Sequence, residues 1–326
     1  MALILTEADV KALLTMDDLI PAMATALAEF SARQVTQPLR TVLTVGERHA
    51  FFGLMPAYIP GTPALGTKLV TVFEGNTERG LPTHLATIVL LDPETGALLA
   101  LMDGRYITEA RTAAVSAVSV QRLARKEAGV LAVVGSGVQA RSHLEAISRV
   151  RRLREVRVWS PNAARAEAFV TAMSPKVAAP ITAAGTAGEA VHGADLIALV
   201  TSAKEPVVRS EWIADGAHLC AVGACRPNQR EMDAPLVARG DLYVDSREAA
   251  LAEAGDIVLA IGDGAIGPSH IKAEIGDVVR GTAEGRASGE RVTIFKSLGL
   301  AVEDLAAAQL AYGRARAHGR GAEVDV

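Results

Sequence analysis

A glycine turn at residues 135–140 constrains the fold of this chain more than any other feature. The run Val130–Val134 is wholly apolar and rich in β-branched residues, and Gly135, Gly137 and Ala140 follow it, ahead of a sequence with helical periodicity. This order predicts a strand, a tight turn and a helix. The first glycine permits the turn, the second lets backbone approach a pyrophosphate, and the small third residue lets the helix pack close to the strand. Because the free N–H groups of such a helix favour an anion, we expect a dinucleotide here.

Beyond this turn, short apolar runs alternate with helical patterns. Strands that alternate with helices predict βαβ units and a parallel, doubly wound sheet. We therefore expect a Rossmann domain over residues 116–300. Its expected strands are Val156–Trp159, Asp195–Val200, His218–Val222 and Leu242–Val244, its expected helices are Ala163–Met173 and Ser246–Glu253, and Gly281–Gly289 is an expected surface loop.

Residues 1–115 form a different unit. Helical spacing over 6–14 and 16–32, with Thr6 and Thr15 as N-caps, precedes several strand-like segments, which predicts an α+β domain around a mostly antiparallel sheet. A long amphipathic helix, Ile107–Arg125, then leads into the glycine turn, and the pattern of the closing helix, Ala301–Ala317, fits either domain. The fold class is therefore α/β. The expected strands are Pro38–Val45, His49–Met55, Leu65–Phe73, Leu85–Leu91 and Ala97–Met102, the last two joined by the turn Asp92–Gly96.

Composition narrows the class of protein. A chain of 326 residues with 50% hydrophobic and 21% charged residues has a normal globular balance, and its net charge of -4 favours neither nucleic acid nor an anionic membrane as partner. Cys220 and Cys225 show no metal-ligand spacing, so we expect reduced thiols and no metal site. Acidic residues near the N-terminus exclude a signal peptide, and no apolar run approaches the length of a membrane span. These features predict a cytoplasmic protein.

Three cations of the first domain stand out. Lys68 and Arg40 each lie inside an expected strand, and Arg111 lies in the expected first turn of the long helix, behind Thr108. A positive side chain is unfavourable at a helix N-terminus, and a bound anion would relieve this. Each cation alone fits a solvated face with its stem along the surface. Together, on a domain beside a nicotinamide site, the three indicate a clamp for a carboxylate.

Six sequence segments, spread in order over nearly the whole chain, resemble those of one protein family. On these segments the sequence resembles the ornithine cyclodeaminase/mu-crystallin family. The segments are GTKLVTVFEGN at 66–76, LLALMDGRYITEARTAAVSA at 98–117, VVGSGVQA at 133–140, GACRPNQREMD at 223–233, LYVDSREAAL at 242–251 and IFKSLGLAVED at 294–304.

The resemblance implies an N-terminal substrate-binding and dimerisation domain over 1–115, completed by a C-terminal helix in 301–326, a Rossmann domain for NAD(H) or NADP(H) over 116–300, an active site between them, and a homodimer. It implies that Arg40, Lys68 and Arg111 hold the substrate carboxylate. It also places the following residues along the dinucleotide: Thr112, Gly135, Ser136, Gly137, Val138, Gln139, Val200, Thr201, Ser202, Val222, Gly223, Ser297, Leu298 and Gly299.

One departure from the family pattern separates its branches. Ornithine cyclodeaminases and similar alanine dehydrogenases carry an Asp in a G-[GA]-D-x-P block, where this chain has Cys225. A thiol is a weak hydrogen-bonding group and is mostly protonated near neutral pH, so it is a poor substitute. The sequence ACRP, together with FKSLGLAVED, resembles the ketimine reductases instead.

We therefore expect a reductase of cyclic ketimine carboxylates, with a small imine or amino acid as partner. Two alternatives stay open: a cyclodeaminase or amino-acid dehydrogenase of the same family, and a non-catalytic binding protein of the crystallin type. Cys225 is expected to line the pocket, or else to be a small buried residue. His84 is a possible second-sphere or cofactor contact, although a histidine on a strand is more often structural.

The end of the second Rossmann strand bears on the cofactor. NAD-preferring domains place an acidic residue there for the ribose hydroxyls. This chain has Ser160, Pro161 and Asn162 instead, and Arg165 follows within reach of a phosphate. We therefore expect NADP(H) to be preferred, with NAD(H) possible.

Overall fold

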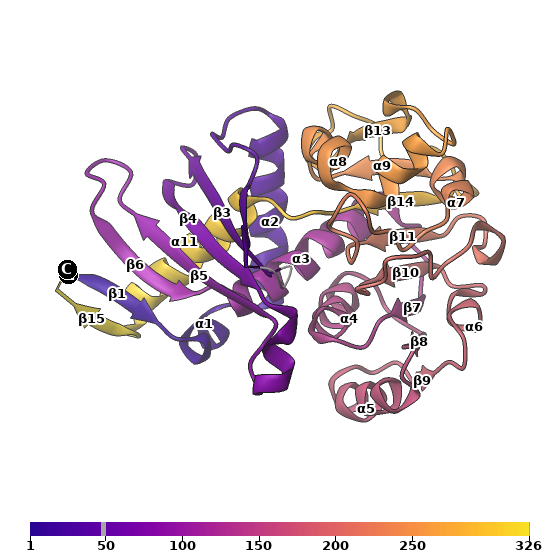
Figure 1. Cartoon of the computed structure of the whole chain (residues 1–326), viewed down its shortest axis with the longest axis horizontal. Coiled ribbons are helices and arrows are strands. Elements are labelled where there is room, and N and C mark those ends of the chain that lie inside the picture. The colour runs from indigo at the N-terminus through magenta and orange to yellow at the C-terminus, as the bar shows by residue number, and fades with distance from the viewer. Residues whose placement is uncertain (47–49, 326) are drawn as a thin grey trace. The chain divides into compact units, whose positions relative to one another are not determined.

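The computed structural model describes residues 1–46 and 50–325. Its contacts divide the chain into two compact units (Figure 1). The first unit comprises Met1–Arg111 and Leu300–Val326, and the second comprises Thr112–Gly299. The second unit is thus an insertion within the sequence of the first.

An eight-stranded sheet forms the centre of the second unit. Its strands are β7 (Val130–Val134), β8 (Glu155–Trp159), β9 (Ile181–Ala183), β10 (Leu196–Leu199), β11 (His218–Ala221), β12 (Asp241–Val244), β13 (Ile271–Glu274) and β14 (Thr293–Lys296). They pair in the order β13-β12-β14-β11-β10-β7-β8-β9, and every pair is parallel. The run β9-β8-β7-β10-β11 is the Rossmann order, which reverses between β7 and β10. The predicted fold class is confirmed.

Helices cover both faces of this sheet, and β7 shows why. Leu131 and Val133 pack into one buried cluster with α4 and α5, whereas Ala132 and Val134 pack into another with α7 and α9. Alternate side chains of a strand point to opposite faces, so an apolar strand needs cover on both. The helices are α4 (Val138–Val150), α5 (Ala163–Met173), α6 (Ala187–Val191), α7 (Ala234–Arg239), α8 (Arg247–Glu253), α9 (Gly255–Gly262), α10 (Ile275–Arg280) and the end of α3 (Arg105–Leu123).

A mixed sheet forms the centre of the first unit. Its strands are β1 (Ala2–Leu5), β2 (Thr41–Val45), β3 (Ala50–Ile59), β4 (Ala64–Val72), β5 (His84–Leu91), β6 (Leu98–Asp103) and β15 (Ala322–Val324). They pair in the order β15-β1-β6-β5-β4-β3-β2, antiparallel throughout except for β1 with β6. The predicted, mostly antiparallel sheet is therefore present.

Among the described residues, three α-helices belong wholly to the first unit: α1 (Glu7–Leu13), α2 (Met16–Ser31) and α11 (Ala301–His318). Thr6 caps α1 in a capping box with Asp9, as predicted, whereas Thr15 precedes α2 without capping it through its side chain. The closing helix α11 contacts β3, β4, β5 and α2, so within the first unit it lies against the sheet (Figure 1).

The expected strands are present with shifted ends. β2 begins at Thr41 rather than at residue 38, and the expected start of the next strand, His49, lies outside the described residues. β3 continues through Pro56 to Ile59. Pro56 lies past the residues of β3 that pair with β2, so a proline there interrupts no ladder on that side. The short strands β1, β9 and β15 were not predicted, whereas β10, β11 and β12, of four residues each, were predicted as apolar runs between helical patterns.

The position of Arg111 in its helix was predicted wrongly. α3 begins at Arg105 and ends at Leu123, so Arg111 lies in the second turn. The hydroxyl of Thr108 donates to the carbonyl of Gly104 (2.7 Å) inside the helix instead of marking its start. The helix dipole is weak beyond the first turn, so it gives no reason to expect an anion at Arg111.

Candidate active site

The glycine turn has the predicted strand, turn and helix. Gly135 adopts a φ of 121°, and a Cβ there would lie 2.8 Å from the carbonyl oxygen of Val200, so only glycine fits. Gly137 is the N-cap of α4, and no side chain caps that helix. A Cβ at Gly137 would meet no atom of the described residues within 4 Å, so these residues leave the approach to the helix start open. Ala140 is fully buried against the strand, as its small size predicts.

These features fit the phosphates of a dinucleotide. The first N–H groups of α4 point out of the helix towards the open side of Gly137, where an anion is favoured. Next to the turn, Oε1 of Gln139 is buried and accepts no hydrogen bond from the described residues. An amide oxygen in that position suits a hydroxyl donor, such as that of a ribose. Ser136 is half-buried and Val138 is exposed at the same turn.

The end of β8 carries the residues that bear on the cofactor. Ser160 is nearly buried, and its hydroxyl accepts a hydrogen bond from the backbone N–H of Asn162 (3.4 Å). Asn162 caps α5 by accepting from the backbone N–H of Arg165 (3.2 Å). The side chain of Arg165 is exposed in the first turn of α5.

Two buried carboxylates hold the other loops at the carboxyl edge of the sheet. Oε1 of Glu231 accepts from the N–H and the hydroxyl of Thr201 (2.7 and 2.8 Å), and Oε2 accepts from the N–H of Gly223 (2.7 Å). Asp245 accepts from the N–H groups of Leu298 and Gly299 (2.5 and 2.7 Å). Both acids have 0% of their surface exposed. Hydrogen bonds to these two buried carboxylates thus fix the loops after β10, β11 and β14. These loops carry the predicted residues Val200, Thr201, Ser202, Val222, Gly223, Ser297, Leu298 and Gly299.

A buried ion pair stands behind Glu231. Nζ of Lys296 lies 2.9 Å from Oδ2 of Asp256, and both side chains are fully buried. Oδ1 of Asp256 accepts from the backbone N–H of Glu231 (2.7 Å). Burial lowers the pKa of Lys296, but Asp256, Cys225 and Glu231 outweigh burial, so its pKa is raised and the lysine is charged. Burial raises the pKa of Glu231, against the opposing charge of Lys296.

Cys225 lies on the loop after β11. It is exposed, and its thiol donates to the carbonyl oxygen of Val222 (3.1 Å), so the alternative of a small buried residue is wrong. Cys220 is buried, and burial raises the pKa of its thiol to about 11, which keeps it protonated. Both cysteines are free thiols.

In the first unit, Lys68 and Arg111 meet on one carboxylate. Nζ of Lys68 on β4 lies 2.6 Å from Oδ2 of Asp304, and Nε of Arg111 on α3 lies 2.9 Å from Oδ1 of the same residue. Nη1 of Arg111 lies 2.5 Å from Oε2 of Glu303. All four side chains are at most 4% exposed, so the solvated-face alternative is wrong for Lys68 and Arg111. We call Lys68, Arg111, Glu303 and Asp304 the buried ion cluster.

The cluster shifts the pKa of its members. Burial lowers the pKa of Lys68 to about 8, against the raising effect of Asp304. Burial alone would raise the pKa of Asp304, but the charges of Arg111 and Lys68 outweigh it and lower that pKa. Asp304 is therefore ionised, and Lys68 loses its proton only above neutral pH.

Arg40 and His84 lie near the cluster. Arg40 is half-buried directly before β2, and its charge contributes to lowering the pKa of Lys68. His84 is half-buried at the start of β5, and burial, followed by the charge of Lys68, lowers its pKa to about 4. His84 is thus neutral at pH 7. Arg40, Lys68, His84 and Arg111 belong to the first unit, and the other predicted residues, beginning with Thr112, belong to the second.

Sequence reasoning missed the acids. Glu303 and Asp304 lie in the first turn of α11, where carboxylates are favoured, and Asp245 directly follows the buried strand β12. The position of these acids next to wholly apolar runs was the one sequence feature that could have indicated their burial. Their partners are distant in sequence, so no local pattern could identify them.

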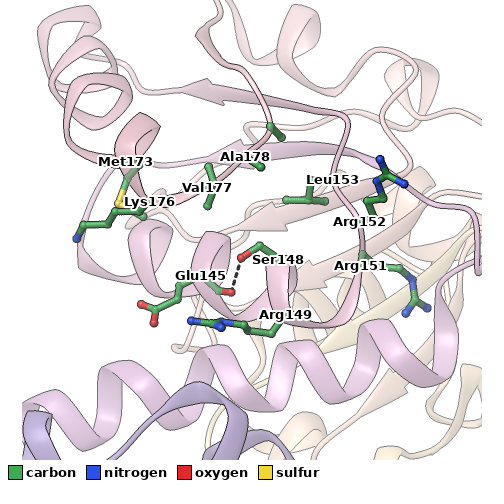
Figure 2. A pocket seen from close by; sticks show the side chains of 11 residues that line it. Glu145, Ser148, Arg149, Arg151, Arg152, Leu153, Met173, Lys176, Val177 and Ala178 are labelled. Carbon is green, nitrogen blue, oxygen red and sulfur yellow. Dashed lines mark hydrogen bonds between the residues drawn. The ribbon is translucent and has the colours of Figure 1, made fainter.

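A cavity of about 660 Å³ lies elsewhere in the second unit (Figure 2). It is lined by the end of α4, by Leu153 before β8, and by Val177 to Ala179 before β9, which places it at the amino edge of the sheet. Its Arg151 donates to the carbonyl oxygens of Val120 and Arg125. None of the predicted site residues lines it, so it is separate from the candidate site.

Residues 1–319 match the ornithine cyclodeaminase/mu-crystallin family. The chain belongs to this family. The ketimine reductase mu-crystallin of Rattus norvegicus is 46% identical over 297 residues, which cover 90% of this chain and 91% of that protein. The predicted resemblance is confirmed, and with it the expectation of an oxidoreductase.

Two solved structures of the family share the whole fold. The Δ1-pyrroline-2-carboxylate reductase of Thermococcus litoralis, in complex with NADH and L-proline, has a TM-score of 0.96 and 39% identity, covering 99% of this chain and 100% of that chain. An archaeal alanine dehydrogenase dimer with bound NAD has a TM-score of 0.94 and 34% identity, covering 99% of each chain. Within the described part of our chain, no helix has both the length and the apolar character needed to span a membrane.

The loops held by Glu231 allow a test of their packing. In Gly223→Ala, the new Cβ would lie 2.0 Å from the carbonyl oxygen of Thr201 and 2.5 Å from Oε1 of Glu231. We expect the free energy of unfolding, measured with urea, to fall by about 1–3 kcal/mol because of overpacking. Gly267→Ala is the control, since a Cβ there meets no atom within 4 Å. An equal, small effect of both substitutions would contradict the close packing.

Proposed function

We propose that this protein reduces cyclic ketimine carboxylates, such as Δ1-pyrroline-2-carboxylate and Δ1-piperideine-2-carboxylate, to cyclic amino acids with NAD(P)H. The observation that carries the proposal is the near full-length similarity to a ketimine reductase and to a Δ1-pyrroline-2-carboxylate reductase. Both names describe reduction of a C=N bond, and the second name places that bond beside a carboxylate. The buried ion cluster adds a physical reason, because it brings two cations together in the unit that lacks the glycine turn.

In this proposal, Arg40, Lys68 and Arg111 bind the substrate carboxylate. Counted with Glu303 and Asp304, these three cations leave one net positive charge, which matches a single carboxylate. Charged hydrogen bonds in a site with little water are strong, and Arg can present two parallel donors to a carboxylate. The three side chains thereby fix the orientation of the ring and its imine carbon.

The second unit would hold the dinucleotide. The turn Gly135–Gln139 would receive the pyrophosphate, and Thr112 with the loops at Val200–Ser202, Val222–Gly223 and Ser297–Gly299 would lie along the rest. When bound, reduced nicotinamide supplies a hydride to the imine carbon, and the nitrogen carries a proton from water. A protonated imine is already electrophilic, so we assign most of the rate to positioning by this chain rather than to a dedicated acid.

The cation clamp is tested by Arg111→Ala. We expect kcat/KM for a cyclic ketimine to fall by about two orders of magnitude or more, from loss of a charged hydrogen bond and misplacement of the substrate, while the Kd of the cofactor stays unchanged. Lys68→Ala should behave alike. Arg105→Ala is the matched control on α3, since Arg105 pairs with Glu7 near the surface and should keep kcat/KM. Near wild-type activity of Arg111→Ala or Lys68→Ala would remove that residue from the clamp.

We further propose a preference for NADPH. No acid ends β8, and the exposed Arg165 can reach a 2′-phosphate. Arg165→Ala should raise the KM for NADPH about tenfold, as expected for loss of a charged contact, and leave the KM for NADH unchanged. Steady-state kinetics with both cofactors measure this. Equal or better kcat/KM of the wild-type protein with NADH would refute the preference.

Cys225 sets the reductase apart from a cyclodeaminase. Cyclodeamination oxidises the amine, expels ammonia and reduces the ring imine, so it needs a group that exchanges protons at the substrate nitrogen or water. An ionised carboxylate can also hold an ammonium group, which a neutral thiol cannot. Reduction of a ready-made ketimine omits the first two steps.

The decisive assay compares substrates. With NADPH or NADH, the purified protein should reduce five- or six-membered cyclic ketimines and release neither proline nor ammonia from ornithine. Robust proline formation would move the assignment to the cyclodeaminases. Because an archaeal alanine dehydrogenase shares the fold at 34% identity, alanine with NAD(P)⁺ is the third substrate to assay. Dominant turnover of alanine would make the protein an amino-acid dehydrogenase, and turnover of none would favour a binding protein.

We also propose a homodimer formed by the first unit. Every residue of β2 is exposed, although β2 is an edge strand that carries Val42, Leu43 and Val45. An exposed apolar edge strand is unusual for a monomer. The archaeal alanine dehydrogenase structure is a dimer. Light scattering, which gives the molar mass in solution, tests the proposal.

A further inference from the structure

Asp304 contacts both cations of the buried ion cluster. Its Oδ2 lies 2.6 Å from Nζ of Lys68 on β4, and its Oδ1 lies 2.9 Å from Nε of Arg111 on α3. Asp304 is fully buried in the first turn of α11. A single carboxylate of α11 thus joins that helix to β4 and α3.

We propose that Asp304 is a positioning residue of the reductase, which holds Lys68 and Arg111 at a fixed separation for one substrate carboxylate. This inference rests on the function proposed above. Lys68 and Arg111 carry like charges and repel each other. Without an anion between them, the two side chains would not remain buried close together. Glu303 supports Asp304 by binding a different nitrogen of Arg111, Nη1, which fixes the plane of the guanidinium.

Asp304 also controls the charge of Lys68. The groups around Lys68 are Asp304 from α11, Arg111 and the hydroxyl of Thr108 from α3, Arg40 before β2, and His84 from β5. Burial and the charges of Arg111 and Arg40 lower the pKa of Lys68, and His84 is neutral. Asp304 is the group that opposes them.

The pH dependence of kcat/KM reports the charge of Lys68. Only protonated Lys68 attracts a carboxylate, so kcat/KM should fall at high pH as Lys68 loses its proton. Removing the negative charge of Asp304 removes the influence that raises the pKa of Lys68. In Asp304→Asn, the fall should therefore occur at lower pH than in the wild-type protein. A purely structural acid would not move this part of the pH profile.

The experiment measures kcat and KM for Δ1-pyrroline-2-carboxylate between pH 5 and 9.5 at saturating NADPH. For Asp304→Asn, we expect KM to rise about tenfold or more, as for loss of a charged contact. The high-pH fall in kcat/KM should move down by about 1–3 pH units, as for loss of an opposite charge within contact distance. The substrate's own titration is the same for all variants, so the difference between profiles reports the enzyme.

Two further variants separate positioning from stability. Asp304→Glu keeps the charge but displaces it, so KM should rise while the high-pH fall stays near the wild-type position. This variant carries the test if Asp304→Asn does not fold. Asp256→Asn is the matched control, because Asp256 forms an equally buried ion pair with Lys296 in the second unit, whereas Lys68 belongs to the first. Its high-pH fall should not move, whatever it costs in stability.

The outcomes are distinct. If the wild-type protein reduces no cyclic ketimine with either cofactor, the proposed function fails and the inference fails with it. If the wild-type protein is active but folded Asp304→Asn keeps its KM and its pH profile, the inference alone is overturned. A wild-type KM for Asp304→Glu would also overturn the inference, because it would show that displacing Lys68 and Arg111 does not affect substrate binding.

Discussion

A carboxylate that loses all contact with water must be compensated by the protein, and this requirement organises both units. The effective cost of burying one ion is several kcal/mol, so each buried acid must collect N–H donors or cations. Glu231 and Asp245 collect backbone N–H groups from loops at the carboxyl edge of the parallel sheet. Asp304 collects two side-chain cations instead. The same constraint therefore fixes the backbone of several loops in the second unit and the positions of two cations in the first.

The fold was predictable where a local pattern coincided with a structural need. The turn at Gly135 requires a φ of 121°, which excludes other residues, and so the glycine is visible in sequence and diagnostic in structure. The alternation of strands and helices after it correctly predicted a parallel, doubly wound sheet. The short strands β1, β9 and β15 were found only in the structure, whereas β10, β11 and β12, of four residues each, were predicted because they are apolar runs between helical patterns. The extension of β3 through Pro56 depended on where a neighbouring strand ends, which sequence does not reveal.

The candidate site was predictable only in part. Lys68 and Arg111 could be singled out as cations in unusual places, but the argument from the helix dipole was wrong, because α3 begins earlier than predicted. What makes these cations unusual is their burial with Asp304, whose partners lie on other elements far away in sequence. Family resemblance supplied only the expected roles of the loop residues. It did not supply Glu231, Asp245 or Asp304, which hold those loops and cations in place.

The split of the first unit affects how the protein is made. Synthesis on the ribosome proceeds from the N-terminus, and domains generally fold as units as they emerge. Here Met1–Arg111 emerge first, but α11, which covers their sheet, emerges only after the whole of Thr112–Gly299. Until then Lys68 and Arg111 have no Asp304 to neutralise them, whereas the second unit has all its strands. The unit that begins first in the sequence must therefore be the last to close.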